Sequence, residues 1–163
     1  MKNKITQAGT LGFDKEESKD LIMALNKLLA NYQVHYQKLR NFHWNVTGPD
    51  FFELHEQFEL EYNQVKLNID VLAERIRIYG ARPLSTMKEY IEQATISEAH
   101  EKVSSKEMVS EILSDFENLL TDVVTCQELS ATSGDTATYN MLTRWAEHLE
   151  KRHWMLTAWL GSE

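Results

Sequence analysis

Residues 21–76 decide the fold, and they read LIMALNKLLANYQVHYQKLRNFHWNVTGPDFFELHEQFELEYNQVKLNIDVLAERI. Apolar or aromatic side chains recur every three or four positions on both sides of a short break at residues 47–50, which is the period of helices with one buried face. The break contains Gly48 and Pro49, and this pair ends a helix. The stretch therefore predicts two long helices in an antiparallel hairpin. The first stripe is Leu21, Leu25, Leu28, Tyr32, Tyr36, Leu39 and His43, and the second is Phe51, Leu54, Phe58, Tyr62, Val65, Ile69, Leu72 and Ile76.

The rest of the chain adds two long helices and one short one. Gly80 and Pro83 stop the second helix, and the less regular residues 84–103 contain a short helix near 87–91. Ser104 and Glu107 have the spacing of a capping box, which begins a third long helix that ends at a polar break over 130–135. A last helix ends at Gly161. The prediction is an all-α four-helix bundle, with a short extra helix in a second connection long enough to cross the bundle. Residues 1–12 are predicted to be a flexible tail and residues 13–163 the domain.

Composition sets limits on the class of protein. A chain of 163 residues, 42% hydrophobic and 26% charged, fits one globular domain. No apolar run approaches the ~18 residues of a membrane span, so no membrane association is expected. The single cysteine, Cys126, favours a reducing cytoplasm. Seventeen basic against 25 acidic residues give a net charge of −8, which argues against a nucleic-acid surface and is compatible with handling cations.

Candidate metal ligands lie on one side of the second predicted helix. His55, Glu59, Asp70 and Glu74 share a sector that borders the apolar stripe, and His43 continues the stripe of the first helix. Imidazole and carboxylate ligands suit divalent iron, manganese or zinc. The alternative is that the acidic residues are only solvated and that His43 is a satisfied core residue. Two i, i+4 pairs on one sector, with His43 at the same hairpin end, favour a metal site.

The separation of these residues along the helix has a consequence for assembly. His55 and Asp70 are fifteen residues apart, about 22 Å at ~1.5 Å per residue. Metal–ligand bonds of ~2.0–2.2 Å prevent one ion from contacting both within one chain. A two-fold partner with an antiparallel second helix brings its Asp70 and Glu74 beside this chain's histidines. If these residues bind one metal centre, the protein is therefore a homo-oligomer.

A metal centre inside the bundle is the competing arrangement. It needs two Glu-x-x-His motifs, and the chain offers one, Glu150 to His153. The corresponding position on the second helix after Glu74 is Arg77. We therefore disfavour an intra-bundle centre and interpret Glu150 and His153 as a surface pair.

The chain resembles a known family at several points. The stretch NFHWNVTGPDFFELHE at 41–56 carries the resemblance, together with residues 70–75, 83–90, 134–135 and 150–160. It is similar to the Dps family, the DNA-protection-during-starvation proteins or miniferritins of the ferritin-like superfamily. The resemblance implies a dodecameric cage that oxidises Fe²⁺ between two-fold-related subunits, preferentially with hydrogen peroxide. It also implies storage of ferric mineral and protection of DNA and cell from oxidative damage.

The resemblance also assigns roles to residues. By position, His43, His55, Asp70 and Glu74 match the family's iron ligands and catalytic residues. Glu59 stands where the family more often has aspartate, and its extra methylene still allows direct or water-mediated contact. Trp44 matches a tryptophan that can intercept oxidising radicals, and the alternative for it is a core or interface aromatic.

Two departures from the family limit what the resemblance implies. Some members bind DNA through lysine-rich tails, whereas only Lys2 and Lys4 precede an acidic segment here. We therefore expect weak or no DNA binding; the alternative function is a DNA-binding nucleoid protein with little ferroxidase activity. The acidic iron-entry pore of the family is only partly present, since Asp135 is followed by Tyr139 and Asn140.

Overall fold

The computed structural model describes residues 18–100 and 103–161. These ranges contain helices α1 (Lys19–Asn45), α2 (Phe51–Ile78), α3 (Met87–Gln93), α4 (Ser105–Thr132) and α5 (Thr136–Leu160), and no strand. The predicted all-α class and the order of the long and short helices are confirmed. The tail predicted over residues 1–12 lies outside the described residues, as do residues 13–17 of the predicted domain.

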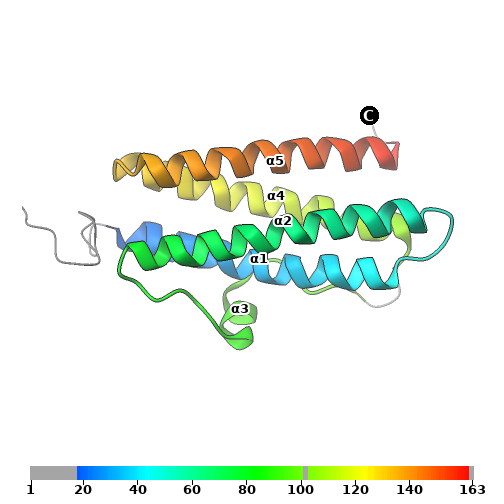
Figure 1. Cartoon of the computed structure of the whole chain (residues 1–163), viewed down its shortest axis with the longest axis horizontal. Helices are drawn as coiled ribbons and strands as arrows, with labels where there is room; N and C mark the ends of the chain where they lie inside the picture. The colour runs from blue at the N-terminus through cyan, green and yellow to red at the C-terminus, as the bar shows by residue number, and fades with distance from the viewer. Residues whose placement is uncertain (1–17, 101–102, 162–163) are drawn as a thin grey trace, which may run out of the picture.

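The four long helices form a bundle in which α1 and α2 are an antiparallel hairpin (Figure 1). The segment from α2 to α4 runs back along the bundle and carries α3 against the side of α1, so α2 and α4 point the same way (Figure 1). A tight turn joins α4 to the antiparallel α5. This long crossover distinguishes a ferritin-like bundle from an up-down one, as the sequence predicts.

Local chemistry explains where the helices begin and end. Ser104 forms the predicted capping box with Glu107, and Thr86 forms a second one with Glu89 at the start of α3. Gly161 ends α5 with a φ of 72°, a left-handed conformation that glycine adopts without strain.

Helix α4 continues slightly beyond the predicted break at residue 130 and ends at Thr132. The hydroxyl of Ser130 donates to the carbonyl of Gln127, and that of Thr132 donates to the carbonyl of Glu128. These bonds satisfy the polar side chains within the helix, so the turn forms only at Ser133 and Gly134.

The core lies along the axis between the four long helices. Its largest fully buried side chains come from α1, α2 and α4 and from the end of α2: Tyr32, Tyr79, Phe42, Phe58, Phe116, Leu25, Leu28, Leu29, Leu39, Leu54, Leu72 and Ile76. None of the described helices has the length and apolarity needed to cross a bilayer.

Candidate metal centre

Two histidines meet at the hairpin end of α1 and α2. His43 lies in the last turn of α1 and His55 in the first turns of α2, and their rings stack with centroids 3.7 Å apart. His43 is buried, whereas His55 is partly exposed and also stacks on Phe51. The short loop between the helices thus brings together residues that are twelve positions apart in the sequence.

Reciprocal hydrogen bonds fix the orientation of both imidazoles. The Nδ1 atom of His43 lies 2.8 Å from the carbonyl oxygen of His55, and the Nδ1 atom of His55 lies 2.8 Å from the carbonyl oxygen of His43. Because a carbonyl oxygen can only accept, each Nδ1 carries the hydrogen and donates it. Each Nε2 then keeps its lone pair, and neither has a hydrogen-bond partner in the described part of the chain. Both side chains are held in the tautomer that binds a metal through Nε2.

Glu59 follows His55 by one helical turn, about 6 Å along the axis. Its side chain is exposed, and its Oε1 atom accepts a hydrogen bond of 3.2 Å from the hydroxyl of Tyr62. The Tyr62 ring also packs edge-on against His43, with centroids 5.4 Å apart. The sequence reasoning placed Tyr62 only in the apolar stripe and missed its contacts with two candidate ligands.

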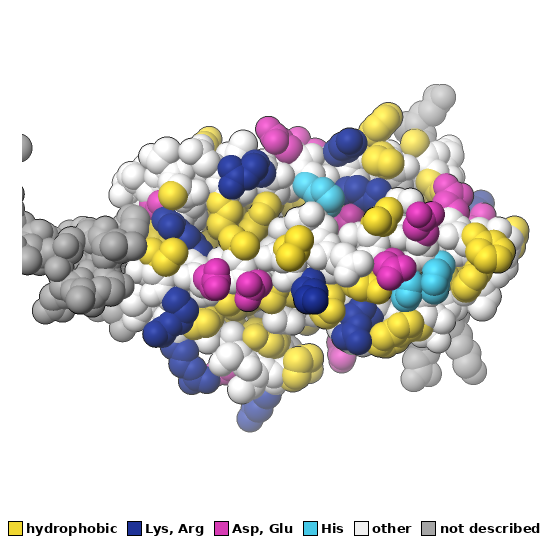
Figure 2. Space-filling view, viewed as in Figure 1, with side chains coloured by type: hydrophobic (Ala, Val, Ile, Leu, Met, Phe, Trp, Pro, Cys, Tyr) yellow, Lys and Arg dark blue, Asp and Glu magenta, His cyan; other side chains and the backbone are white. Residues whose placement is uncertain are grey.

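Asp70 and Glu74 are exposed farther along α2, away from the histidines. Neither carboxylate has a hydrogen bond or ion pair within the described ranges. Figure 2 shows this face: histidine and acidic side chains gather near the α1–α2 hairpin, and further acidic side chains lie toward the other end. Among the described residues, no three His, Cys, Asp or Glu side chains are close enough together to hold a metal ion. One chain therefore brings His43 and His55 together, with Glu59 nearby, but leaves Asp70 and Glu74 apart from them.

The same side of α2 also exposes large apolar residues. Phe52 is 84% exposed, Leu67 60% and Leu60 57%, and Val71 is exposed as well. On a helical wheel at about 100° per residue, these side chains and the two distant carboxylates fall within a sector of about 100°. An exposed apolar stripe of this kind is typical of a surface that another molecule covers.

Trp44 lies one residue beyond His43, and its ring makes no ring contact with either histidine in the described part of the chain. Its side chain is 56% exposed. The guanidinium of Arg40 lies 4.8 Å from the Trp44 ring centroid and 5.3 Å from that of Tyr36. The tryptophan is therefore an exposed aromatic in a cation–π contact and not a core residue.

The bundle interior holds charged residues that the sequence reasoning missed. Glu61 is buried and accepts hydrogen bonds from His148 and from Arg152, at 2.9 and 2.8 Å. Burial by itself raises the pKa of Glu61, but these partners outweigh it and hold the pKa below its usual value. The signal was available: Glu61 occupies a core position between Phe58 and Val65 in the stripe of α2.

A second buried cluster joins α1 to α4. Asp115 lies 2.9 Å from Nδ1 of His35 and 2.8 Å from the ammonium of Lys38. These partners occupy the Asp115 carboxylate, and His148 and Arg152 occupy that of Glu61, so neither cluster is arranged as an open metal site. Nε2 of His35 is buried without a hydrogen-bond partner in the described part of the chain. Outside the two clusters, Glu150 is exposed and His153 lies 3.4 Å from Glu117, which agrees with a surface pair.

Asp135, the candidate pore residue, faces into the protein. Its side chain is 1% exposed, caps α5 and pairs with Arg75 at 2.6 Å, and Tyr79 also hydrogen-bonds to it. Burial by itself raises the pKa of Asp135, but hydrogen bonds from Arg75 and two neighbouring hydroxyls lower it to about 2. Within the single chain, Asp135 therefore links the start of α5 to the end of α2.

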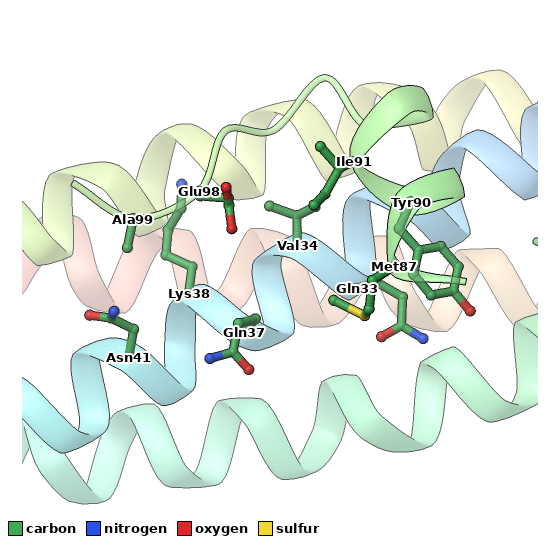
Figure 3. Close-up of a pocket in the computed structure, with 10 residues that line it drawn as sticks. All are labelled: Gln33, Val34, Gln37, Lys38, Asn41, Met87, Tyr90, Ile91, Glu98 and Ala99. Carbon is green, nitrogen blue, oxygen red and sulfur yellow. The ribbon is translucent and has the colours of Figure 1, made fainter. Parts of the chain in front are cut away.

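A cavity of about 160 Å³ lies between α1 and the segment that carries α3 (Figure 3). Amide side chains of Gln33, Gln37 and Asn41 line it from α1, and α3 contributes apolar side chains. Neither His43 nor His55 lines this cavity. The candidate metal centre thus lies apart from this cavity.

The chain is similar to known proteins over most of its length. A model of the ferritin-like domain matches residues 22–162. General stress protein 20U of Bacillus subtilis is 42% identical over 144 residues, covering 88% of this chain and 99% of the relative. DNA protection during starvation protein 2 of Bacillus anthracis matches to the same extent. The crystal structure of a Dps protein from Vibrio cholerae O1, described as a member of the ferritin-like diiron-carboxylate superfamily, superposes with a TM-score of 0.90. It is 39% identical and covers 95% of this chain and 98% of its own.

Proposed function

This chain belongs to the Dps family of ferritin-like proteins, and from this premise we propose that it oxidises Fe²⁺ at sites shared by two-fold-related subunits. Hydrogen peroxide is the preferred oxidant in this proposal, and the ferric product collects as mineral inside a dodecameric cage. Iron is therefore both substrate and stored cargo. Removal of Fe²⁺ together with peroxide protects DNA and the cell from oxidative damage.

The observation that carries this proposal is the fixed pair of imidazoles. Reciprocal bonds from Nδ1 to carbonyl oxygens hold His43 and His55 so that both Nε2 lone pairs are available. In metal sites, a hydrogen bond from the other ring nitrogen of this kind orients the histidine that binds the metal. An orientation imposed by the backbone costs the site little reorganisation when Fe²⁺ arrives.

The remaining ligands come from the partner in this proposal. Asp70 and Glu74 lie too far from the histidines to share an ion within one chain, but an antiparallel two-fold pairing of α2 brings them to the other copy's histidines. The exposed apolar side chains on the same sector of α2 supply a surface for that pairing. Glu59 adds a third carboxylate beside the histidines.

The ligand set suits the oxidation of iron. Fe³⁺ is a harder ion than Fe²⁺, so carboxylate oxygens stabilise the product more than the substrate. Two Fe²⁺ ions each give one electron to one peroxide molecule, which leaves as water after taking up protons. Because both electrons reach the same peroxide, no hydroxyl radical is released.

Direct DNA binding is weak or absent in this proposal. The chain has a net charge of −8, and neutralisation of phosphates requires many cationic contacts. Protection then depends on chemistry and not on coating the DNA. A single cysteine, buried in α4, fits a reducing compartment such as the cytoplasm.

Hybrid shells test the shared site. His43→Ala and Asp70→Ala should each slow peroxide-driven oxidation of Fe²⁺, followed as the growth of ferric absorbance. Mixing the two variants after dissociation and reassembly should restore part of the rate, because some interfaces then combine an intact histidine side with an intact carboxylate side.

The control mixes two preparations of His43→Ala alone, which should recover nothing. Subunit exchange is verified by mass spectrometry of differently labelled chains. Absence of rescue despite verified exchange would contradict the shared site, and a wild-type protein that oxidises Fe²⁺ no faster than buffer would contradict the function itself.

A further inference from the structure

Tyr62 contacts a candidate iron ligand on each of the two helices. Its hydroxyl donates to Oε1 of Glu59 at 3.2 Å, and its ring packs edge-on against His43 with centroids 5.4 Å apart. The ring is partly buried between the two helices, with Tyr36 on a further side at 6.1 Å. Among the aromatic side chains of the described chain that can be oxidised, Tyr62 is the one that contacts both His43 and Glu59.

Trp44 is placed less favourably for the same task. It is 56% exposed, and the guanidinium of Arg40 lies 4.8 Å from its ring centroid. A fixed positive charge over the ring opposes formation of a cation radical there by direct Coulomb repulsion. Its neighbour in the sequence, His43, faces Tyr62 and His55 instead.

We propose that Tyr62 donates one electron and one proton to the reaction when a site holds a single Fe²⁺ ion. This inference rests on the proposed ferroxidase function and adds a residue to it. A lone Fe²⁺ can give hydrogen peroxide only one electron, and the products are Fe³⁺, hydroxide and a hydroxyl radical. The second electron must then come from a group beside the site.

The electron and the proton leave Tyr62 by different routes. The hydroxyl radical takes an electron from the Tyr62 ring and becomes hydroxide. The phenolic proton moves along the existing hydrogen bond to the carboxylate of Glu59 and from there to hydroxide, which forms water. The neutral tyrosyl radical that remains is reduced by the next Fe²⁺ to arrive, and the phenolate formed in that step takes up a proton from water. The sum is two Fe²⁺ oxidised per peroxide, the same balance as when two ions react together.

Rapid-freeze electron paramagnetic resonance tests this role in the assembled protein. Wild-type protein loaded with less than one Fe²⁺ per proposed site is mixed with hydrogen peroxide and frozen. A tyrosyl signal should appear, narrow when the protein carries ring-deuterated tyrosine, and disappear in Tyr62→Phe. Over repeated additions of Fe²⁺ at this low loading, which let the next ion reduce the radical, peroxide consumed per iron oxidised should rise toward double in that variant, with more spin-trapped hydroxyl radical.

Tyr36→Phe is the matched control, because Tyr36 is the neighbouring tyrosine in the same aromatic contact and has no recorded contact with His43 or Glu59. It should keep the radical signal and the low-loading stoichiometry. Circular dichroism and native mass spectrometry establish that both variants fold and assemble.

Three outcomes overturn the inference. The tyrosyl signal persists in Tyr62→Phe, or the wild type oxidises iron at low loading without any tyrosyl signal, or the signal belongs to tryptophan and is lost in Trp44→Phe. Each of these leaves iron oxidation itself intact, so failure of this inference is distinguishable from failure of the proposed function.

Discussion

The centre of the bundle and the outer face of α2 both contain histidine and carboxylate side chains, but the carboxylates are paired in the centre and, among the described residues, unpaired on the face. In the centre, Glu61 and Asp115 are held by histidine, lysine and arginine partners from other helices. On the face, Asp70 and Glu74 have no partner in the described chain, and the histidines beside the hairpin keep free Nε2 atoms. The presence of carboxylates that no protein group occupies, and not the mere presence of histidine and carboxylate, distinguishes a place that can bind a metal from one that cannot.

The difference follows from burial. A charge in the low-dielectric interior must be paired, because an isolated one costs several kcal/mol (about 3–5 when a partner is removed). A charge on the surface is stabilised by water, so it needs no protein partner and remains available to bind a ligand. The charged side chains inside the bundle therefore stabilise the fold, whereas those on the α2 face remain available to bind a metal ion.

The largest effect should come from breaking an interior pair. Glu61→Ala leaves Arg152, whose side chain is only 13% exposed, without its carboxylate, and should lower the free energy of unfolding by about 3–5 kcal/mol. Guanidinium titration followed by circular dichroism at fixed protein concentration measures it. Glu74→Ala on the same helix is the matched control: it should change stability by less than about 0.5 kcal/mol and slow iron oxidation instead.

A double variant sharpens that comparison. Replacing both Glu61 and Arg152 by leucine removes the uncompensated charge together with its partner. Stability should recover to near the wild-type value, because an apolar pair can replace a buried ion pair. If Glu61→Ala proves as harmless as Glu74→Ala, the distinction between interior and face is wrong.

An intermediate effect on stability is expected when acid protonates Asp135. Its pKa is about 2 in the folded protein against 3.8 ordinarily, so the ionised carboxylate stabilises the fold above about pH 4. That contribution, about 2 kcal/mol, is lost as pH falls through about 2. Unfolding free energies measured from about pH 5 down to about pH 2 should show this loss in the wild type.

Asp135→Asn provides the comparison for that pH series. The amide does not titrate, so this part of the acid dependence should disappear, while stability at neutral pH falls toward the wild-type value in acid. An unchanged acid dependence in Asp135→Asn would show that other carboxylates account for it.

The smallest effect on the fold is expected on the α2 face. Leu67→Asp changes a side chain that is 60% exposed, so the bundle's own stability should change by no more than about 0.5 kcal/mol. Pairing through this face should nevertheless weaken, and iron oxidation with it. Sedimentation velocity and the oxidation assay measure the two consequences, with Leu67→Met as the size-conserving control.

An unaltered sedimentation profile and oxidation rate for Leu67→Asp would place the partner surface elsewhere. A loss of helical content in the same variant would instead show that Leu67 supports the single bundle. Sedimentation and helical content together thus distinguish a role of Leu67 in assembly from a role in folding.

Much of the fold could be predicted because its signals are local. The spacing of apolar residues, the Gly48–Pro49 break and the capping box at Ser104 each act within a few residues, and the structure contains all of them. The approach of His43 to His55 was predictable for the same reason, since a short loop leaves the flanking turns little freedom.

What could not be predicted depends on contacts between distant helices. The partners of Glu61 come from α5, and the partners of Asp135 distant in sequence, Arg75 and Tyr79, come from α2 and its end. A carboxylate near an apolar stripe looks the same in sequence whether it is solvated or paired across the core. The hydrogen bonds that set the tautomers of His43 and His55 likewise exist only once the two backbones are in place.

The spacing of His43 and His55 from Asp70 and Glu74 has a consequence for newly made subunits. A single unassembled subunit has only half of the proposed set of metal ligands. It therefore binds Fe²⁺ less tightly than an assembled cage and does not oxidise Fe²⁺ where no cage interior can hold the ferric product. Under the proposed function, iron oxidation begins only when the subunit interfaces have formed, so assembly itself controls activity and no separate regulator is needed.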